Sequence, residues 1–175
     1  AIADFNKVLE SNPKNEQVYN NLGIYKHDLN DFKGASIYFK KAIKINPKSF
    51  LAFYNSGNNK EELGDLKGAF SDYTKAIEIN PEFRDAYNNR GNVRSDLGDA
   101  EGATSDYNKA IEIDPNNELS YYNIGLLKKN LGELEVSIIY LNKALEINNT
   151  YADAYNLRGN VKNLLGDTKG AIDDY

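Results

Sequence analysis

The sequence contains no cysteine, no methionine and no tryptophan, and His27 is its only histidine. Without cysteine the chain has no disulfide framework and no thiolate nucleophile. With His27 as the only histidine and no cysteine, the familiar nucleophilic triads cannot be assembled twice over, and catalysis is poorly supported. Metal-ligand spacings and a glycine-rich phosphate loop are also missing from the sequence. We therefore predict that the chain is not an enzyme and that it holds no cofactor and no metal.

Long apolar runs and an excess of positive charge are absent as well. No stretch approaches the roughly 18 apolar residues of a membrane-spanning helix, so we expect no membrane span. The formal net charge is −5, from 21 basic and 26 acidic residues. This balance gives no electrostatic reason to expect a phosphate backbone as ligand, and we predict no binding to nucleic acid.

Proline is scarce but regular. Its four copies recur at one constant spacing, at Pro13, Pro47, Pro81 and Pro115. The segment Asp-Ala-Tyr-Asn-Asn-Arg-Gly-Asn at 85–92 returns as Asp-Ala-Tyr-Asn-Leu-Arg-Gly-Asn at 153–160. A fixed period of this length predicts a stack of similar structural units that share one core.

Alignment on the prolines divides the chain into repeats. Four complete repeats occupy 16–49, 50–83, 84–117 and 118–151, between the second half of a repeat at 1–15 and a shortened repeat at 152–175. Because the chain begins in mid-repeat and has no methionine, we expect it to be a fragment of a longer array.

Each repeat is expected to form two helices joined by a tight turn. A residue suited to a left-handed helix end follows the last leucine of the first helix, at Asn30, Gly64, Gly98, Gly132 and Gly166. An acidic residue suited to capping the second helix comes next, at Asp31, Asp65, Asp99, Glu133 and Asp167. Glycine also recurs inside the first helix, at Gly23, Gly57, Gly91, Gly125 and Gly159. Since glycine in a helix costs about 1 kcal/mol relative to alanine, we expect the two helices to approach closely there.

These registers resemble the tetratricopeptide repeat (TPR), in which an aromatic residue precedes the helix glycine and Leu-Gly-Asp and a later Pro follow at a period of 34. The resemblance covers essentially the whole chain. It implies an all-α solenoid, a right-handed superhelix of antiparallel helix pairs whose first helices line a concave groove. In the family that groove commonly takes an extended peptide or a partner's helix. The chain departs from the family by having Tyr or Phe in place of the usual first-helix Trp.

Asparagine is the first candidate for binding. One register holds Asn21, Asn55, Asn89 and Asn123, and a second, just after the glycine, holds Asn58, Asn92 and Asn160. A side-chain amide has both a donor and an acceptor, which matches a peptide group. The first register resembles the asparagine ladder along the TPR superhelix of O-GlcNAc transferases, which implies a groove that holds a peptide by its backbone. The alternative is that these asparagines cap or bridge neighbouring helices.

Apolar residues form the second candidate. Tyr54 and Tyr122 occupy one first-helix register, and Leu51 and Leu119 stand nearly one helical turn before them. These pairs predict two apolar spots that anchor side chains of a bound peptide. The alternative is that the residues pack against the next repeat.

Charged residues also recur in two registers. Arginine before the helix glycine occurs with aspartate at the facing register of the second helix, which predicts the structural ion pairs Arg90–Asp106 and Arg158–Asp174. Where Leu22 or Ile124 replaces the arginine, tyrosine replaces the aspartate. A basic residue nearly one turn after each helix glycine forms a column at Lys26, Lys60, Arg94, Lys128 and Lys162. This column is either a row of cations for acidic partners or a solvated edge balanced by the acidic turn residues.

Two hypotheses about function follow. The first is a scaffold that binds a protein or peptide partner in its concave groove. The second is a non-catalytic, substrate-selecting TPR arm of a larger enzyme such as a glycosyltransferase. In addition, we expect the apolar faces of the truncated end repeats, around Ile2, Phe5, Leu9 and Tyr175, to allow end-to-end self-association.

Overall fold

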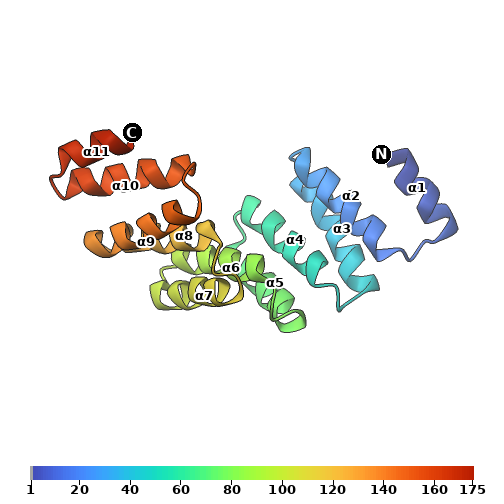
Figure 1. Ribbon diagram of the computed structural model, residues 1–175. Helices are drawn as coiled ribbons and strands as arrows, with labels where there is room; N and C mark the ends of the chain where they lie inside the picture. The colour runs from blue at the N-terminus through green and yellow to red at the C-terminus, as the bar shows by residue number, and fades with distance from the viewer. Residues whose placement is uncertain (1) are drawn as a thin grey trace. The chain divides into compact units, whose positions relative to one another are not determined.

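The computed structural model describes the backbone of residues 2–175 and the side chains of residue 5 and residues 7–175. Within these residues the chain forms helices and no strands (Figure 1). The helices are α1 (Ile2–Ser11), α2 (Glu16–Asp28), α3 (Phe32–Ile45), α4 (Phe50–Glu62), α5 (Leu66–Ile79), α6 (Arg84–Asp96), α7 (Ala100–Ile113), α8 (Glu118–Asn130), α9 (Leu134–Ile147), α10 (Ala152–Leu164) and α11 (Thr168–Asp174). The chain divides into two compact units, 1–93 and 94–175, and the division falls inside α6.

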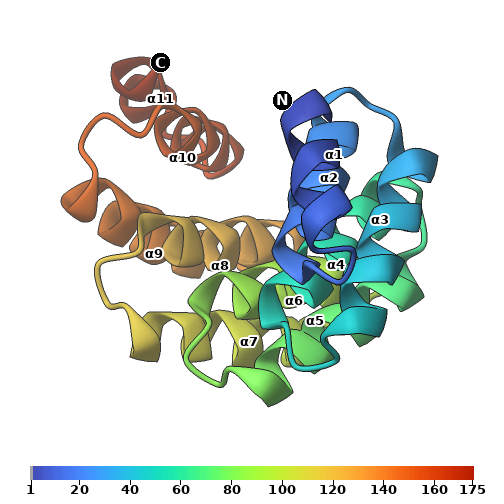
Figure 2. The same cartoon turned by 90° about the vertical axis from the view of Figure 1, so that its right-hand side faces the viewer.

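The helices alternate between a first and a second type with the period of the sequence. The first helices of successive pairs begin at Glu16, Phe50, Arg84, Glu118 and Ala152, and this spacing equals that of the prolines. The all-α fold expected from the sequence is therefore present. Within the second unit, Figures 1 and 2 show α10 and α11 as one antiparallel pair.

The turn inside each pair closes as the sequence predicts. Asn30 has a φ of 58°, and the glycines at 64, 98, 132 and 166 have φ between 75° and 86°. The left-handed residue lets the next amide bond back across the helix end, as when Asp65 N donates to Lys60 O over 2.8 Å. A Cβ added to any of these four glycines would meet no atom within 4 Å, so the positive φ, and not lack of space, is what favours glycine there.

The acidic residue after the turn caps the second helix in four of the five pairs. Its carboxylate accepts the amide of a glycine further along the first turn, as Asp65 does from Gly68 over 2.9 Å, and the same cap forms at Asp31, Asp99 and Asp167. Glu133 makes no such bond, and its carboxylate instead lies 2.8 Å from Lys128 Nζ. Glutamate is one methylene longer and is a weaker N-cap than aspartate, so the sequence-based expectation of a side-chain cap is wrong at this one turn.

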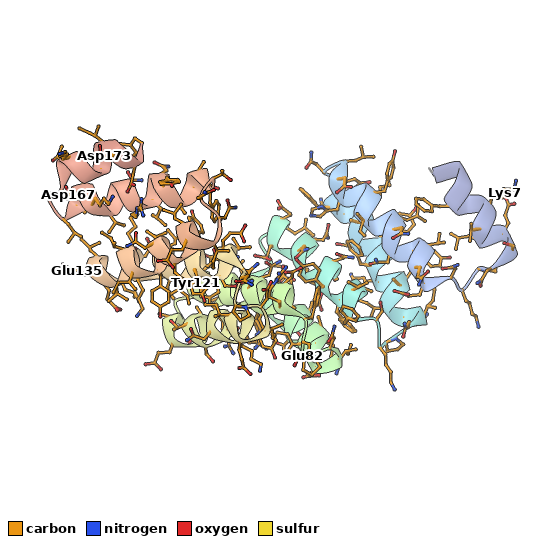
Figure 3. All side chains as sticks on the ribbon, viewed as in Figure 1. Lys7, Glu82, Tyr121, Glu135, Asp167 and Asp173 are labelled. Carbon is orange, nitrogen blue, oxygen red and sulfur yellow. The ribbon has the colours of Figure 1, made fainter. Side chains whose placement is uncertain are left out.

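The core of each unit lies between neighbouring repeats. In the first unit, Ala69, Tyr73 and Val93 are buried together and join α5 to α6. In the second, Leu141 and Leu145 of α9 pack with Leu157 and Val161 of α10. Side chains fill the space between the paired helices, and charged residues such as Asp167 and Asp173 stand at the surface (Figure 3). A repeat therefore completes its core with its neighbour.

Four of the five glycines inside the first helices have a large side chain of the second helix recorded against them. A Cβ on Gly23 would lie 2.4 Å from a carbon of the Phe39 ring, and one on Gly57 would lie 2.6 Å from the Tyr73 ring. Gly125 faces Leu141 and Gly159 faces Tyr175 in the same way. The close helix approach predicted from these glycines is present at all four positions.

Gly57→Ala is therefore expected to destabilise the protein, even though alanine is the better helix former by about 1 kcal/mol. The new Cβ meets the Tyr73 ring, which is fully buried, and overpacking of this kind costs about 1–3 kcal/mol. Urea unfolding followed by circular dichroism measures the change. Ser71→Ala on the exposed face of α5 is the control and should be neutral or slightly stabilising. A stabilised Gly57→Ala protein would show that the ring gives way freely.

Candidate functional site

The asparagines of the first register connect neighbouring first helices within the first unit. Asn55 Nδ2 on α4 donates to Asn20 Oδ1 on α2 over 3.1 Å. Asn89 Nδ2 on α6 lies 3.2 Å from Tyr54 Oη and 2.9 Å from Asn58 Oδ1, both on α4. At Asn55 and Asn89 the structure thus shows the bridging interpretation, with amides engaged between helices.

The second asparagine register has a partner that the sequence reading missed. The hydroxyl of Tyr73 lies 2.7 Å from Asn58 Oδ1 and also contacts the Glu61 carboxylate, so two acceptors share its one proton. The hydroxyl of Tyr175 donates to Asn160 Oδ1 over 2.9 Å. Burial raises the pKa of Tyr73 well above its ordinary value, so the hydroxyl stays protonated and donates. These asparagines therefore satisfy a tyrosine that packs on the helix glycine.

A pattern in the sequence could have revealed this pairing. An asparagine at the second register goes with a tyrosine in the second helix of the same repeat, as at Asn58 and Tyr73. Where the second-register residue is apolar, at Ile24 and Leu126, the later residue has no hydroxyl, namely Phe39 and Leu141. Asn92 and Tyr107 follow the same rule in sequence. The hydroxyl appears only where an amide is present to accept its proton.

The remaining candidates have separate surroundings. Asn21 on α2 is exposed, Asn92 on α6 is half-buried, and Asn160 on α10 is exposed. Asn123 on α8 is buried, and its Nδ2 has no hydrogen-bond partner among the described residues. The amides are therefore not equivalent around the chain.

The two tyrosines of the predicted apolar spots pack against neighbouring aromatic rings. The ring of Tyr54 contacts Phe83 with 4.9 Å between centroids, and Tyr122 contacts Tyr151 at 5.2 Å. The leucines beside them stay open to solvent, at 47% for Leu51 and 41% for Leu119. The leucine is thus the accessible part of each apolar spot.

Two hollows lie between α2 and α4, one on either side of the Asn20–Asn55 hydrogen bond. The Leu51 hollow, of about 390 Å³, has Gln17, Asn20 and Asn21 of α2 on one side and Phe50 and Leu51 of α4 on the other. The Asp28 hollow, of about 250 Å³, is lined by Ile24, His27, Asp28, Phe39, Asn55 and Asn58. Several predicted groove residues of the first unit therefore line open space.

The Arg158–Asp174 pair predicted from the sequence is formed in the second unit. Arg158 Nε lies 2.8 Å from Asp174 Oδ2, and Nη2 bonds the other carboxylate oxygen. Lys162, from the basic column, also reaches this carboxylate, at 2.8 Å. Burial by itself would raise the pKa of Asp174, but the hydrogen bonds and charges of Arg158 and Lys162 hold it below its ordinary value.

Arg90 and Asp106 belong to different units, and their pairing stays a prediction. In the first unit Arg90 Nη1 lies 3.2 Å from Thr74 Oγ1, and its guanidinium lies over the Tyr87 ring at 5.6 Å. In the second unit Asp106, with 3% of its side chain exposed, pairs with Arg94 Nη1 at 3.2 Å.

The whole basic column is occupied inside the repeats. Lys60, Arg94 and Lys162 bind the aspartate of the second helix, while Lys26 and Lys128 bind the acidic turn residue. The choice follows the sequence, because the repeats of Lys26 and Lys128 have Tyr38 and Tyr140 where the others have aspartate. The structure therefore favours the interpretation in which these basic residues are balanced by acidic residues of their own repeat, over a row of cations for an acidic partner.

No metal-ligand cluster is found among the described residues. None of the helices in 2–175 combines the length and the apolar character that a bilayer-spanning helix needs. Of the end residues expected to support self-association, Tyr175 is 68% exposed and Phe5 and Leu9 are half-buried. Ile2 lies outside the described side chains.

Comparison with known families identifies the repeat. A family model described as "TPR repeat" matches 57–98 and 92–132, and one described as "Tetratricopeptide repeat" matches 16–49 and 119–151. The chain belongs to the tetratricopeptide repeat family. No curated protein is similar enough in sequence to count as a match.

Solved TPR structures share the fold at low sequence identity. PilW, a widely conserved type IV pilus biogenesis factor, is 21% identical, with a TM-score of 0.90 over 99% of this chain and 80% of its own. A TPR protein from Parabacteroides merdae ATCC 43184 is 22% identical, with a TM-score of 0.84 over 97% of this chain and 68% of its own. YrrB, a TPR protein with an unusual peptide-binding site, is 22% identical, with a TM-score of 0.75 over 97% and 88%. The TPR fold supports a role as a protein–protein interaction scaffold.

The Asn58–Tyr73 pair of this TPR protein can be tested by a double-mutant cycle. Asn58→Ile removes one of the two acceptors of the Tyr73 hydroxyl, leaving the Glu61 carboxylate, and it also removes the Oδ1 that Asn89 uses. We therefore expect a loss of about 0.5–1.5 kcal/mol in unfolding free energy. Adding Tyr73→Phe reproduces the Ile24 and Phe39 combination, and the double variant should lose clearly less than the sum of the singles. Additive losses in urea unfolding would mean that the pairing contributes nothing of its own.

The charge pair at the last TPR helix predicts a pH dependence. A carboxyl whose pKa is lower in the folded than in the unfolded chain stabilises the fold above the unfolded value, here 3.8, and loses this contribution as the pH falls through the folded pKa. Between about pH 5 and pH 2, the wild type should therefore lose more stability than Asp174→Asn. Thermal unfolding across this range measures the difference. Asp173→Asn, at the exposed neighbour, should keep the wild-type slope, and equal slopes for all three proteins would contradict the assignment.

Proposed function

We propose that this TPR protein is an interaction scaffold that binds a peptide segment of a partner along the first-helix face of residues 1–93. The observation that supports this most directly is the pair of hollows between α2 and α4. Ligand sites are concave and use polar groups to orient the ligand. Both hollows are lined mostly by polar side chains, and each also has two apolar ones, Phe50 and Leu51 in the first and Ile24 and Phe39 in the second.

The amides beside the hollows suit a peptide backbone. Asn21 and Gln17 are exposed on α2, and each offers a donor and an acceptor. The Asn55 amide uses one hydrogen for Asn20, and the same side chain lines the Asp28 hollow. Because a side-chain amide matches any peptide group, it binds the main chain irrespective of sequence, and the exposed Leu51 adds an apolar contact. The peptide-binding site named for YrrB, a protein of the same fold, is in keeping with this proposal.

The same groove would serve the second hypothesis, a substrate-selecting arm of a larger enzyme. In either case the groove binds a segment of a partner protein. The sequences of the peptides that the groove selects indicate what that segment is like.

A peptide-display selection tests the proposal on three proteins. A random linear library is selected on the wild type, and the enriched peptides are then measured on a groove variant with Gln17→Ala, Asn21→Ala and Leu51→Ala. These side chains are exposed and line the Leu51 hollow, while the bridging Asn55 and Asn89 stay intact. We expect the enriched peptides to bind the groove variant about tenfold more weakly, because each lost contact removes part of a small binding energy.

The matched control carries Lys33→Ala, Ile37→Ala and Lys44→Ala, at exposed positions of α3. It should bind the same peptides as the wild type. Peptides that bind the groove variant and the wild type equally, or that are lost on the α3 variant instead, would place the interaction elsewhere and refute the proposal.

A further inference from the structure

The groove between α2 and α4 is formed by two helices that run in the same direction. Ser49 Oγ, which caps α4, donates to Glu16 Oε1 at the start of α2 over 2.6 Å. Asn55 and Asn20, one turn or more further along each helix, are joined at 3.1 Å. Because equivalent positions meet at both points, the helices are parallel, and the two hollows follow one another along their length.

The separation of the hollows matches an extended peptide. The α2 residues that line the Leu51 hollow stand about eight positions before those that line the Asp28 hollow, which is about 12 Å at 1.5 Å per helical residue. In an extended chain, residues i and i+4 project on the same side and lie about 13 Å apart. A strand that lies along the groove therefore places two side chains, four residues apart, in the two hollows.

The Leu51 hollow suits an apolar side chain. Leu51 is 47% exposed and stands beside Phe50. Two charged side chains, Glu16 and Lys48, also line this hollow. The Glu16 carboxylate is engaged, since it accepts the Ser49 hydroxyl. Covering Leu51 with an apolar side chain removes apolar surface of both from water.

The Asp28 hollow suits a long basic side chain. Its apolar part is formed by Phe39, which is buried, and Ile24, which is 36% exposed. Asp28 has 69% of its side chain exposed, and its nearest ion-pair contact is His27 Nδ1, at 3.9 Å. Lysine and arginine bury their methylene stems along apolar surface while the cation stays at the rim, so the stem would cover Ile24 and the cation would meet the Asp28 carboxylate.

We propose that this groove selects an extended segment of a partner protein with an apolar residue and, four positions away, an arginine or lysine. The Leu51 hollow takes the apolar side chain and the Asp28 hollow takes the basic one. The inference deepens the proposed function and depends on it, because it names the side chains that a peptide in this groove presents.

Four fluorescein-labelled peptides test the assignment by fluorescence anisotropy at low salt. The first has Leu and Arg separated by three Thr or Ser residues. The others replace Arg by Glu, replace Leu by Ala, or shorten the spacing to one residue. The wild type should prefer the first peptide by about two- to fivefold over the Glu peptide, by about fivefold over the Ala peptide, and also over the shortened one.

Two single variants each change one preference only. Asp28→Lys should invert the choice between Arg and Glu and leave the choice between Leu and Ala intact. Leu51→Ala should abolish the choice between Leu and Ala and leave the choice between Arg and Glu intact. The controls are Asp173→Lys, with the same charge change at an exposed site, and Ile37→Ala, at another exposed aliphatic residue; both should behave as the wild type.

The outcomes separate this inference from the proposed function. If none of the four peptides binds, or if preferences do not follow the variants, the side-chain assignment is wrong. If displayed peptides still depend on Gln17, Asn21 and Leu51 in that case, groove binding stands and only the motif fails. Loss of both results would refute the groove itself.

Discussion

The two helices of a pair pack closely where a glycine of the first helix faces a large side chain of the second, as at Gly23, Gly57, Gly125 and Gly159. At Gly57 the ring of Tyr73 occupies the space that a Cβ would take. Glycine inside a helix costs about 1 kcal/mol, whereas burying a large apolar side chain contributes about 1.5–3 kcal/mol. Burial therefore outweighs the propensity cost. The close approach also requires a tight turn between the two helices. A residue with positive φ at the end of the first helix provides this turn.

Several buried polar residues of the repeats occur in sets that satisfy one another. A core tyrosine occurs with an asparagine that accepts its proton, as at Tyr73 and Asn58. A buried aspartate occurs with cations on the facing helix, as Asp174 does with Arg158 and Lys162. A buried polar group without a partner costs more than the bond itself contributes. Repeats without the hydroxyl or the carboxylate have apolar residues or tyrosine at the matching positions, so the variation among repeats is a choice between complete sets.

The sequence predicts those features that a single register determines. The repeat period, the left-handed turn at Asn30 and Gly64, and the glycine contacts follow from residue type at one position, and the structure has them. Contacts between registers are harder to predict. The joint variation of two registers pointed to Arg158 and Asp174, but the second cation, Lys162, lies one turn along the same helix. Only the side-chain conformation decides that it also reaches the carboxylate.

The asparagines show the same difficulty more clearly. In the sequence, an asparagine that binds a peptide cannot be told from one that bridges two helices or accepts a tyrosine proton. The role as acceptor of a tyrosine proton can be recognised by comparing repeats, because asparagine at the position of Asn58 occurs together with tyrosine at the position of Tyr73. The charge pattern around Asp28 and the opening beside Leu51 depend on which side chains the neighbouring helix leaves uncovered, and this is a property of the packed structure.

The hydroxyl of Tyr73 also limits how this protein can diversify. One of its two acceptors, Asn58, holds Asn89 of the next helix and lines the Asp28 hollow at the same time. A change at Asn58 that altered ligand preference would therefore also remove the acceptor of Asn89 and leave the Tyr73 hydroxyl to the Glu61 carboxylate. Ile24 and Asp28 have no such tie to a core hydroxyl. New binding preferences should accordingly evolve at Ile24, Asp28 and Leu51 more readily than at Asn58.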